Sequence, residues 1–592
     1  MRASRWKRAA RGSRVAAALV ALGGLASAQL CPTGSTTFGG AGDDFLGGLA
    51  VGSSNELYLA GGTDSFGAGS VDALLLRYEA DGSFGWARTW GGAGDESADA
   101  FTLDLAGALL IAGPTSSFGP SADVFLAKLD GSGTEQWGLT WNTGADEEAT
   151  TVFTDAAGNV FVGGCSSVLV GAGEDALLLR FPATSGTTAP SAVSGVRIFG
   201  DAAADELINS GTIDGSSGTE FVVTAGNWTS HAGGGSDVLV ARYDTVALGL
   251  VWARRWGGPG DDAGDAVALD GTGNFYVAGE TSSGVGGLDV LVQKWDASGT
   301  LLWAIAWGGT GDEGVGYVSQ DAAGNLYLAG ETTSFGSGGQ DGLLLAASPA
   351  GQVLWSMTWG GAQSLEGLGL ERPKPSAGPV RAAGFSDSAA PVFRPVVGTT
   401  TSLSLSTSVP TGITGTPLGL VTPVAATKTS PPNGRGSGIE LYVYELDQGC
   451  YPTYCQAGTS AAGCTAAISG VGTPSATLPS GFVLSTTGVQ GQKDGLYFYG
   501  TNGRQQNPWG NGTSFQCVVP PVKRGGLLSG TGTIGACDGV LVQDLNARFQ
   551  ARPAHNPGPG AVMQAQLWYR DPQNTSNQTT SLSDAVEFVV AP

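Results

Sequence analysis

The sequence predicts an all-β protein, in which a seven-bladed β-propeller of four-stranded antiparallel blades precedes a small β-sandwich-like domain. The first observation is a repeat, because the segment GGAGDD at 39–44 returns in similar or degraded form every 51 to 59 residues. The second is that each repeat holds four runs of strand length bounded by Gly, Asp, Asn and Ser, which favour turns. Repeats of this kind are typical of propeller blades. The later copies lie at 91–96, 143–148, 202–207, 257–262, 308–313 and 360–366.

The first 28 residues are predicted to be a secretory signal peptide. Six basic side chains precede an apolar stretch from Val15 to Leu25, and Ala26-Ser27-Ala28 provides a cleavage site before Gln29. No lipid anchor is expected, because Cys31 lacks the small preceding residue that a lipoprotein signal needs. No later segment is apolar and long enough to span a bilayer. We therefore expect a protein that is secreted into the medium or held at the cell surface.

The body of each repeat is predicted to be one four-stranded sheet. Such a sheet cannot bury both faces alone, so neighbouring sheets must stack around an axis. Tryptophans four residues apart support this stacking, since this spacing on a strand puts both rings on one face, where they fill the space between blades. The pairs are Trp86/Trp90, Trp137/Trp141, Trp252/Trp256, Trp303/Trp307 and Trp355/Trp359.

In these features the chain resembles the bacterial secreted seven-bladed β-propeller repeat family. The resemblance rests on GGTGDE…DAAGNLYLAG at 308–330 and on SADVFLAKLDGSGTEQW at 121–137, and it covers residues 31–449. It implies the fold and an extracellular setting. It implies no chemistry, because propellers host unrelated functions.

The two ends of the propeller, at 29–449, are predicted to close the ring. The last repeat has strands near 365–370 and 380–385 and a third at 439–445, but no fourth strand follows. Residues Ser35–Phe38, just before the first GGAGDD, are expected to supply it, which removes two free sheet edges. Residues 388–437 are then a Thr/Ser/Pro-rich insertion between the second and third strands of this blade. We expect this insertion to overhang the face of the propeller that carries the acids of the GGAGDD-like segments, which we call the acid-bearing face.

Residues 450–592 have a different composition and predict the β-sandwich-like domain. This region resembles a recurrent, uncharacterised tail module of exported bacterial proteins. Its aromatic residues favour core packing, with a sugar-binding surface as the alternative; they are Tyr497, Tyr499, Trp509, Trp568 and Tyr569.

Seven cysteines in an exported chain predict three disulfides and one free thiol. Cys31 and Cys450 flank the closing strands and are expected to pair. Short separation along the chain favours Cys455–Cys464 and Cys517–Cys537. Cys165 lies in a blade strand, where a buried small hydrophobic residue is the default.

Charge and composition exclude several classes of function. The net charge of −23 falls to about −29 without the signal peptide, and an acidic protein of this kind repels nucleic acid and anionic lipid. Only two histidines are present, which argues against a His-based triad or a multi-histidine metal site. An extracellular protein or a glycan is the expected partner, bound by a monomer.

The acids of the GGxGD[DE] motif and those that open the third strands are expected to crowd one face. Because they recur with the repeat, the sequence favours turn capping by these acids, with Ca²⁺ coordination as the alternative and no other cofactor. The candidate Ca²⁺ ligands are Asp43, Asp44, Asp95, Glu96, Asp261, Asp262, Asp312 and Glu313.

No set of residues stands out as catalytic, so the sequence predicts a secreted, non-enzymatic binding scaffold whose ligand docks on the acidic loop face. Two alternatives stay open. One is a propeller hydrolase or lyase acting on polysaccharide through two carboxylates, and the other is a Ca²⁺-dependent surface adhesion protein.

Overall fold

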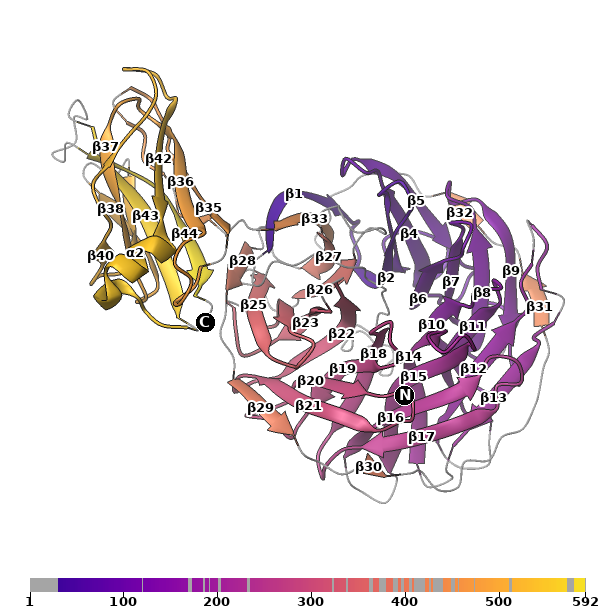
Figure 1. The fold of residues 1–592 in the computed structure, drawn as a ribbon. Coiled ribbons are helices and arrows are strands. Elements are labelled where there is room, and N and C mark those ends of the chain that lie inside the picture. The colour runs from indigo at the N-terminus through magenta and orange to yellow at the C-terminus, as the bar shows by residue number, and fades with distance from the viewer. Residues whose placement is uncertain are drawn as a thin grey trace.

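The computed structural model is an all-β chain, in which antiparallel sheets are arranged around a ring and a second group of strands lies beside it (Figure 1). This arrangement is consistent with a propeller. Within the described part, no helix has the length and apolar character needed to cross a membrane. The structure describes residues 30–590, apart from one- or two-residue gaps and from 169–172, 201–203, 231–234, 361–365, 372–379, 387–391, 396–398, 404–406, 409–420, 430–439, 449–452, 510–513 and 572–579. The predicted signal peptide therefore lies outside the described residues.

Sheets 1 to 6 each take four consecutive strands in chain order. Sheet 1 holds β2 (Asp44–Val51), β3 (Leu57–Thr63), β4 (Asp72–Tyr78) and β5 (Phe84–Trp90). Sheet 2 holds β6 (Ala100–Leu103), β7 (Leu109–Thr115), β8 (Asp123–Leu129) and β9 (Glu135–Trp141). Sheet 3 holds β10 (Glu147–Thr154), β11 (Val160–Ser166), β12 (Asp175–Phe181) and β13 (Gly195–Phe199).

The next three sheets repeat this order. Sheet 4 holds β14 (Ala204–Asp214), β15 (Phe221–Ser230), β16 (Ser236–Asp244) and β17 (Leu250–Trp256). Sheet 5 holds β18 (Asp262–Leu269), β19 (Phe275–Thr281), β20 (Asp289–Trp295) and β21 (Leu301–Gly308). Sheet 6 holds β22 (Glu313–Gln320), β23 (Leu326–Thr332), β24 (Asp341–Ala347) and β25 (Val353–Gly360).

Sheet 7 joins the two ends of the ring. Its strands are ordered β1-β33-β27-β26, so the N-terminal strand completes a sheet whose other members come from the last repeat. Ser35 lies opposite Tyr444 and Phe38 opposite Leu441, which confirms the predicted pairing of these two segments. The bounds are β1 (Leu30–Phe38), β26 (Glu366–Glu371), β27 (Val380–Ser386) and β33 (Glu440–Gln448).

The segment between β27 and β33 runs around the outside of the ring. Each of its described strands pairs antiparallel with the outermost strand of a different sheet, in the order sheet 6, 5, 4, 2 and 1. Figure 1 shows most of these short strands, which we call the belt, along the periphery. The belt consists of β28 (Val392–Pro395), β29 (Thr399–Leu403), β30 (Thr407–Ser408), β31 (Val421–Val424) and β32 (Thr427–Thr429).

The expectation that this insertion overhangs the acid-bearing face is therefore wrong for its described strands. The physical reason is that the outermost strand of each sheet has an unpaired row of backbone N–H and C=O groups. A Thr- and Val-rich segment satisfies these groups by adding a fifth strand.

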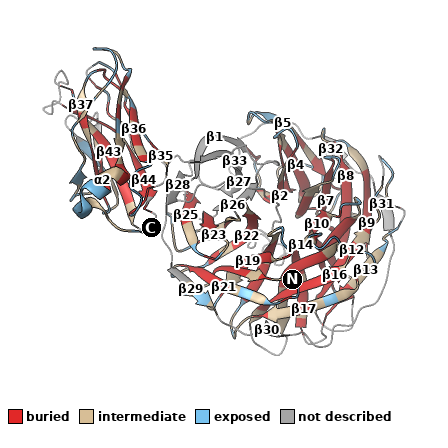
Figure 2. Ribbon diagram, viewed as in Figure 1, coloured by how far each residue is buried: buried red, intermediate tan, exposed pale blue. Residues whose placement is uncertain are grey.

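The core lies between neighbouring sheets, where Figure 2 shows most strand residues as buried. The second tryptophan of each predicted pair is at most 1% exposed. Trp90 of sheet 1 stacks on Phe125 of sheet 2 with ring centroids 4.4 Å apart. The paired tryptophans therefore pack one sheet against the next, as their spacing predicts.

The C-terminal strands form a separate core from two sheets of six and three strands and a two-stranded hairpin. Phe482 and Leu541 of the smaller sheet pack in one cluster with Tyr497 and Leu567 of the larger. The strands are β34 (Thr453–Tyr454), β35 (Ala467–Gly472), β36 (Phe482–Val489), β37 (Asp494–Gly500), β38 (Arg504–Trp509), β39 (Ser514–Val518), β40 (Lys523–Arg524), β41 (Leu528–Ser529), β42 (Gly539–Asp544), β43 (Val562–Arg570) and β44 (Thr580–Val589). Helix α2 (Leu545–Ala551) and the 3₁₀ turn η1 (Pro553–His555) follow β42.

Candidate functional site

The second acid of each GGxGD[DE] motif is buried and hydrogen-bonded. The carboxylate of Glu313, 1% exposed, accepts from the backbone N–H of Gly309 at 2.6 Å and from the hydroxyl of Thr332 at 2.7 Å. Glu96 makes the equivalent contacts with Gly92 and Thr115. A carboxylate that accepts hydrogen bonds from its own glycine loop and from the second strand stabilises the loop, so its role is structural. Asp44 and Asp262 accept from the N–H groups of Gly40 and Gly258 in the same way.

The first acid of the motif is more exposed than the second, and from the second motif onward it links one repeat to the one before it. The carboxylate of Asp312 accepts from the backbone N–H of Leu288 in sheet 5 at 3.0 Å. Asp95 and Asp261 accept in the same way from Val71 and Ser236. These acids therefore cap the loop between the second and third strands of the preceding sheet.

Two buried carboxyl groups face each other where one sheet meets the next. Gly91 separates Asp72, which opens a third strand, from Glu96 of the following motif, and a Cβ on this glycine would lie 2.5 Å from an oxygen of each. Asp289 and Glu313 flank Gly308 in the same arrangement. Burial, together with the charge of Glu313, raises the pKa of Asp289 to about 6, because two desolvated carboxylates disfavour each other's ionised form.

This geometry bears on the predicted Ca²⁺ ligands. Among the described residues, no group of three or more His, Cys, Asp or Glu side chains is arranged to hold a metal ion. The acids of the motif instead accept hydrogen bonds from backbone N–H and hydroxyl groups. The structure therefore favours turn capping for Asp44, Glu96, Asp262 and Glu313.

A second group of acids breaks the repeat, and the sequence analysis missed it. One β-bulge residue on the innermost strands is not the same from sheet to sheet: it is Gly47, Thr150, Asn209, Asp265 or Gly316. A second variable position lies near the end of the second strand of each sheet, at the same register opposite the third strand. The residue there is Gly62, Pro114, Cys165, Asn227, Glu280, Glu331 or Phe385. A position-by-position comparison of the repeats would have revealed both.

These variable positions bring polar side chains together across sheets 4, 5 and 6. The amide nitrogen of Asn209 lies 3.0 Å from the side-chain oxygen of Asn227, 2.9 Å from a carboxylate oxygen of Asp265 and 3.1 Å from the carbonyl of Gly264. The side chain of Glu280 reaches the innermost strand of sheet 6, because a Cβ on Gly314 would lie 3.1 Å from its oxygen. We call Asn209, Asn227, Asp265, Glu280 and Glu331 the polar cluster.

Glu331 is the member of the polar cluster with the most perturbed ionisation. Burial raises its pKa to about 7, a hydrogen bond from Gln340 opposes this shift, and the nearby charge of Asp265 adds to it. A carboxyl group with this pKa is partly protonated at neutral pH, which suits it to donate a proton or to bind an uncharged hydroxyl.

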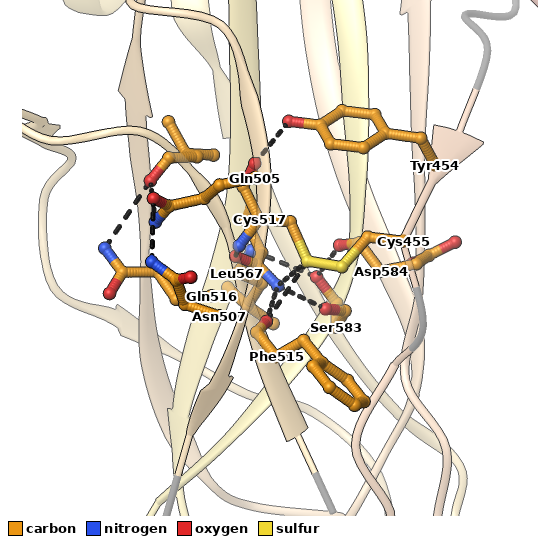
Figure 3. Close-up of a disulfide and its surroundings, with 12 residues drawn as sticks. Tyr454, Cys455, Gln505, Asn507, Phe515, Gln516, Cys517, Leu567, Ser583 and Asp584 are labelled. Carbon is orange, nitrogen blue, oxygen red and sulfur yellow. Dashed lines mark hydrogen bonds between the residues drawn. A yellow bond between two sulfur atoms is a disulfide. The ribbon is translucent and has the colours of Figure 1, made fainter. Parts of the chain in front are cut away.

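The cysteine pairs in the C-terminal region differ from the predicted ones. Cys455 pairs with Cys517 and Cys464 with Cys537, so the predicted pairs Cys455–Cys464 and Cys517–Cys537 are wrong. The sheets of this region bring sequence-distant strands together, so short separation along the chain is a poor guide to the cysteine pairing. Figure 3 shows the first bridge, where the hydroxyl of Tyr454 donates to the carbonyl of Cys517 at 3.0 Å.

The remaining cysteines and the aromatic residues of the C-terminal region are also the subject of predictions. Cys165 is buried and takes part in neither disulfide, as expected, whereas Cys31–Cys450 is untested because Cys450 lies outside the described residues. Tyr497, Tyr499 and Tyr569 are fully buried, which favours packing over a sugar-binding surface.

Comparisons with known proteins add little to this geometry. No family model and no curated protein matches the sequence. Among solved structures, the chain is similar to Sqt1 from Chaetomium thermophilum, with 9% identity, a TM-score of 0.35, and coverage of 60% of this chain and 97% of that one. It is also similar to a quinohemoprotein alcohol dehydrogenase from Pseudomonas putida HK5, with 11% identity, a TM-score of 0.30, and coverage of 60% of this chain and 72% of that one. A third similar structure is the extracellular domain of a candidate one-component system from B. thetaiotaomicron, with 10% identity, a TM-score of 0.20, and coverage of 92% of this chain and 81% of that one. These likenesses are too weak to assign a function.

Proposed function

We propose that the protein is a secreted binding scaffold, built on a seven-bladed propeller, whose ligand docks on the face that carries the GGxGD[DE] loops. The supporting observation is that the reactive side chains of these loops recur from sheet to sheet with the same hydrogen bonds. A structural role recurs with a repeat, whereas a catalytic set is expected once. The two disulfides fit an oxidising, extracellular setting.

The first acids of the motif supply the exposed charge of this face. Loops held by a rigid scaffold commonly carry recognition. Asp95, Asp261 and Asp312 each accept a hydrogen bond from a backbone N–H, and Asp261 and Asp312 are exposed. An extracellular protein or glycan with cationic or hydroxyl groups fits such a surface. Adhesion that depends on Ca²⁺ has no separate support among the described contacts.

The test is a glycan and protein binding screen, followed by charge removal. Asp95→Asn and Asp312→Asn preserve an oxygen that accepts the backbone hydrogen bond and remove the charge. We expect the combined variant to weaken binding of a ligand found in the screen by about tenfold or more, the scale of lost charge-assisted contacts. Asp81→Asn, in a turn at the opposite end of sheet 1, is the control. Equal affinity in all three proteins would reject the acidic face as the docking surface.

A polysaccharide hydrolase is the second candidate, because Glu331 has the raised pKa of a general acid and Asp265 is a second carboxylate near it. Release of reducing ends from a polysaccharide panel, abolished in Glu331→Gln, would replace the scaffold proposal. No turnover on any polysaccharide of the panel would leave the scaffold as the better proposal.

A further inference from the structure

Two segments of the C-terminal domain meet around one buried tyrosine. Strand β40 pairs with β37, and Lys523 lies opposite Tyr499 in this register. Tyr499 is fully buried, and a hydrogen bond of 2.9 Å joins its hydroxyl to Nδ1 of His555 at the end of η1. The buried ring therefore fixes the position of a histidine whose own side chain is only partly buried.

Helix α2 holds an arginine beside the same tyrosine. The guanidinium of Arg548 donates through Nη2 to the backbone carbonyl of Arg524 at 3.0 Å, and it also interacts with the hydroxyl of Tyr499. The Nε of Arg548 is buried without a hydrogen-bond partner. Arg548 is thus held in place by backbone and tyrosine, and no carboxylate neutralises its charge in the described part of the chain.

The charges around His555 are all of one sign. Burial lowers the pKa of His555, and the positive charges of Arg548, Lys523 and Arg552 lower it further. None of these three cations forms an ion pair among the described residues. Elsewhere in the described chain, some basic side chains, such as Arg88 and Arg254, donate to backbone carbonyls without an ion pair. Others pair with acids, namely Arg77–Glu79, Lys128–Asp104, Arg242–Asp214, Arg255–Asp237, Lys294–Asp270 and Arg504–Glu587.

Three cations around one histidine, with no ion pair among the described residues, are unusual in a chain with 51 acidic and 28 basic residues. Basic side chains that gather without an acid repel one another, and an anion removes this repulsion. Guanidinium groups present paired N–H donors that match the oxygens of carboxylate, sulfate and phosphate.

We propose that Lys523, Arg548, Arg552 and His555 form a binding site for an oxyanion, namely a sulfate, phosphate or carboxylate group. The site lies in the C-terminal domain and is independent of the ligand proposed for the ring. It gives the secreted chain a second point of attachment, either to a free inorganic anion or to an acidic polysaccharide that carries such groups.

Calorimetric titration of the full-length protein with inorganic sulfate, and separately with dextran sulfate, tests the site. The first variant is Arg548→Gln, and the second combines Lys523→Gln with Arg552→Gln at two exposed positions, where folding is not at risk. Each is expected to weaken binding by about tenfold, as expected for lost charge-assisted contacts. Arg570→Gln removes the same charge from the exposed end of β43 and should leave affinity unchanged. Tighter binding of dextran sulfate per sulfate group would identify a polymer as the source.

A second readout follows the histidine itself. The chain has only two histidines, so their nitrogen resonances can be followed individually by NMR as the pH is changed. Saturating sulfate should raise the pKa of His555 and leave that of His231 unchanged, and binding should tighten as the pH falls, because the protonated ring adds a donor and a charge. No binding of either sulfate probe, equal weakening in Arg570→Gln, or an unchanged His555 titration would overturn the proposal.

Discussion

Glycine at the fourth position of the outer hairpin turns is required by both the backbone and a neighbouring tryptophan. Gly299 has φ +79°, and a Cβ there would lie 2.9 Å from the ring of Trp252 in the preceding sheet. The same ring donates through its indole N–H to the carbonyl of Ala297 at 3.0 Å. Gly133 makes the same approach to Trp86. Turn, tryptophan and glycine therefore form one recurring contact between sheets.

Gly299→Ala should lower the free energy of unfolding by roughly 2–4 kcal/mol, from left-handed backbone strain and displacement of Trp252. Gly271→Ala is the matched control, because Gly271 has φ +75° with nothing within 4 Å; it should cost only the backbone term, roughly 1–2 kcal/mol. Thermal and denaturant unfolding of both variants measures the difference. Equal losses would show that the tryptophan contact contributes nothing.

Because of Asp289, we expect the stability of the folded protein to decline as the pH rises. Its folded pKa is raised to about 6 from an ordinary value near 3.8, so the folded state holds more protons between these values. The contribution of Asp289 to the free energy of unfolding is therefore fully present below pH 3.8 and is lost as the pH rises through 6. Asp289→Asn should remove this slope and raise the free energy of unfolding at pH 8 by on the order of 2 kcal/mol.

Asp296 provides the control of opposite sign. Hydrogen bonds from Ser298 and Thr300 outweigh desolvation and hold its pKa below the ordinary range, so its contribution is present at neutral pH and lost on acidification. Unfolding measured from pH 3 to 8 in wild type, Asp289→Asn and Asp296→Asn separates the two. An Asp289→Asn curve parallel to that of the wild type would contradict the assignment.

At the residue scale, the sequence allowed the role of the motif acids to be predicted but not the polar cluster. Repetition identified turn capping because Glu96 and Glu313 occupy the same chemical position in different sheets. Asp265 and Glu331 are single departures from the repeat, and their closeness depends on how sheets 5 and 6 pack, which spacing along the chain does not contain.

At the element scale, strand existence followed from turn chemistry, whereas the belt did not. Strands such as Phe275–Thr281 are bounded by Asp and Gly turns and pair with sequence neighbours, so a local pattern is enough. The belt strands are two to five residues long and pair with strands up to hundreds of positions away. No local pattern specifies such pairing.

Replacing residues 388–437 with a short Gly/Ser linker tests the belt. Sheets 1, 2, 4, 5 and 6 keep four strands each and should still fold, but their outermost strands become open edges that promote aggregation. We expect a lower melting temperature of the ring in calorimetry and more light scattering on heating. An unchanged melting temperature without added scattering would show that the belt does not pair with the ring in solution.

The disulfides of the C-terminal domain lead to a second prediction at this scale, which concerns the stability of that domain. The Cys464–Cys537 bridge spans 73 residues, for which constraint of the unfolded chain contributes about 4 kcal/mol in the entropy model. Replacing both cysteines with serine should destabilise the C-terminal domain by about this amount and leave the ring transition in place. Cys165→Ala, which removes a thiol but no bridge, is the control. Non-reducing peptide mapping that found Cys455 joined to Cys464 would contradict the observed pairing.

At the scale of the whole molecule, the ring depends on the contact between its first and last sheets. β1 is contributed by the N-terminus but belongs to sheet 7, and Phe38 at its end is 6% exposed. Its ring stacks on Phe84 of sheet 1 with centroids 5.8 Å apart and lies 5.6 Å from Phe66. Phe38 therefore connects the closing sheet to the opening one. The missing fourth strand of the last repeat allowed the pairing of Ser35–Phe38 to be predicted, but not this aromatic contact.

Phe38→Ala should destabilise the ring as a unit by about 3–5 kcal/mol, because it removes a large buried side chain where sheet 7 packs against sheet 1. The ring transition in calorimetry should move to lower temperature while that of the C-terminal domain stays. Phe84→Ala, at a position 37% exposed, should cost clearly less although it removes the other partner of the same stack. If Phe38→Ala is no more destabilising than Phe84→Ala, the ring is not closed through the N-terminal strand.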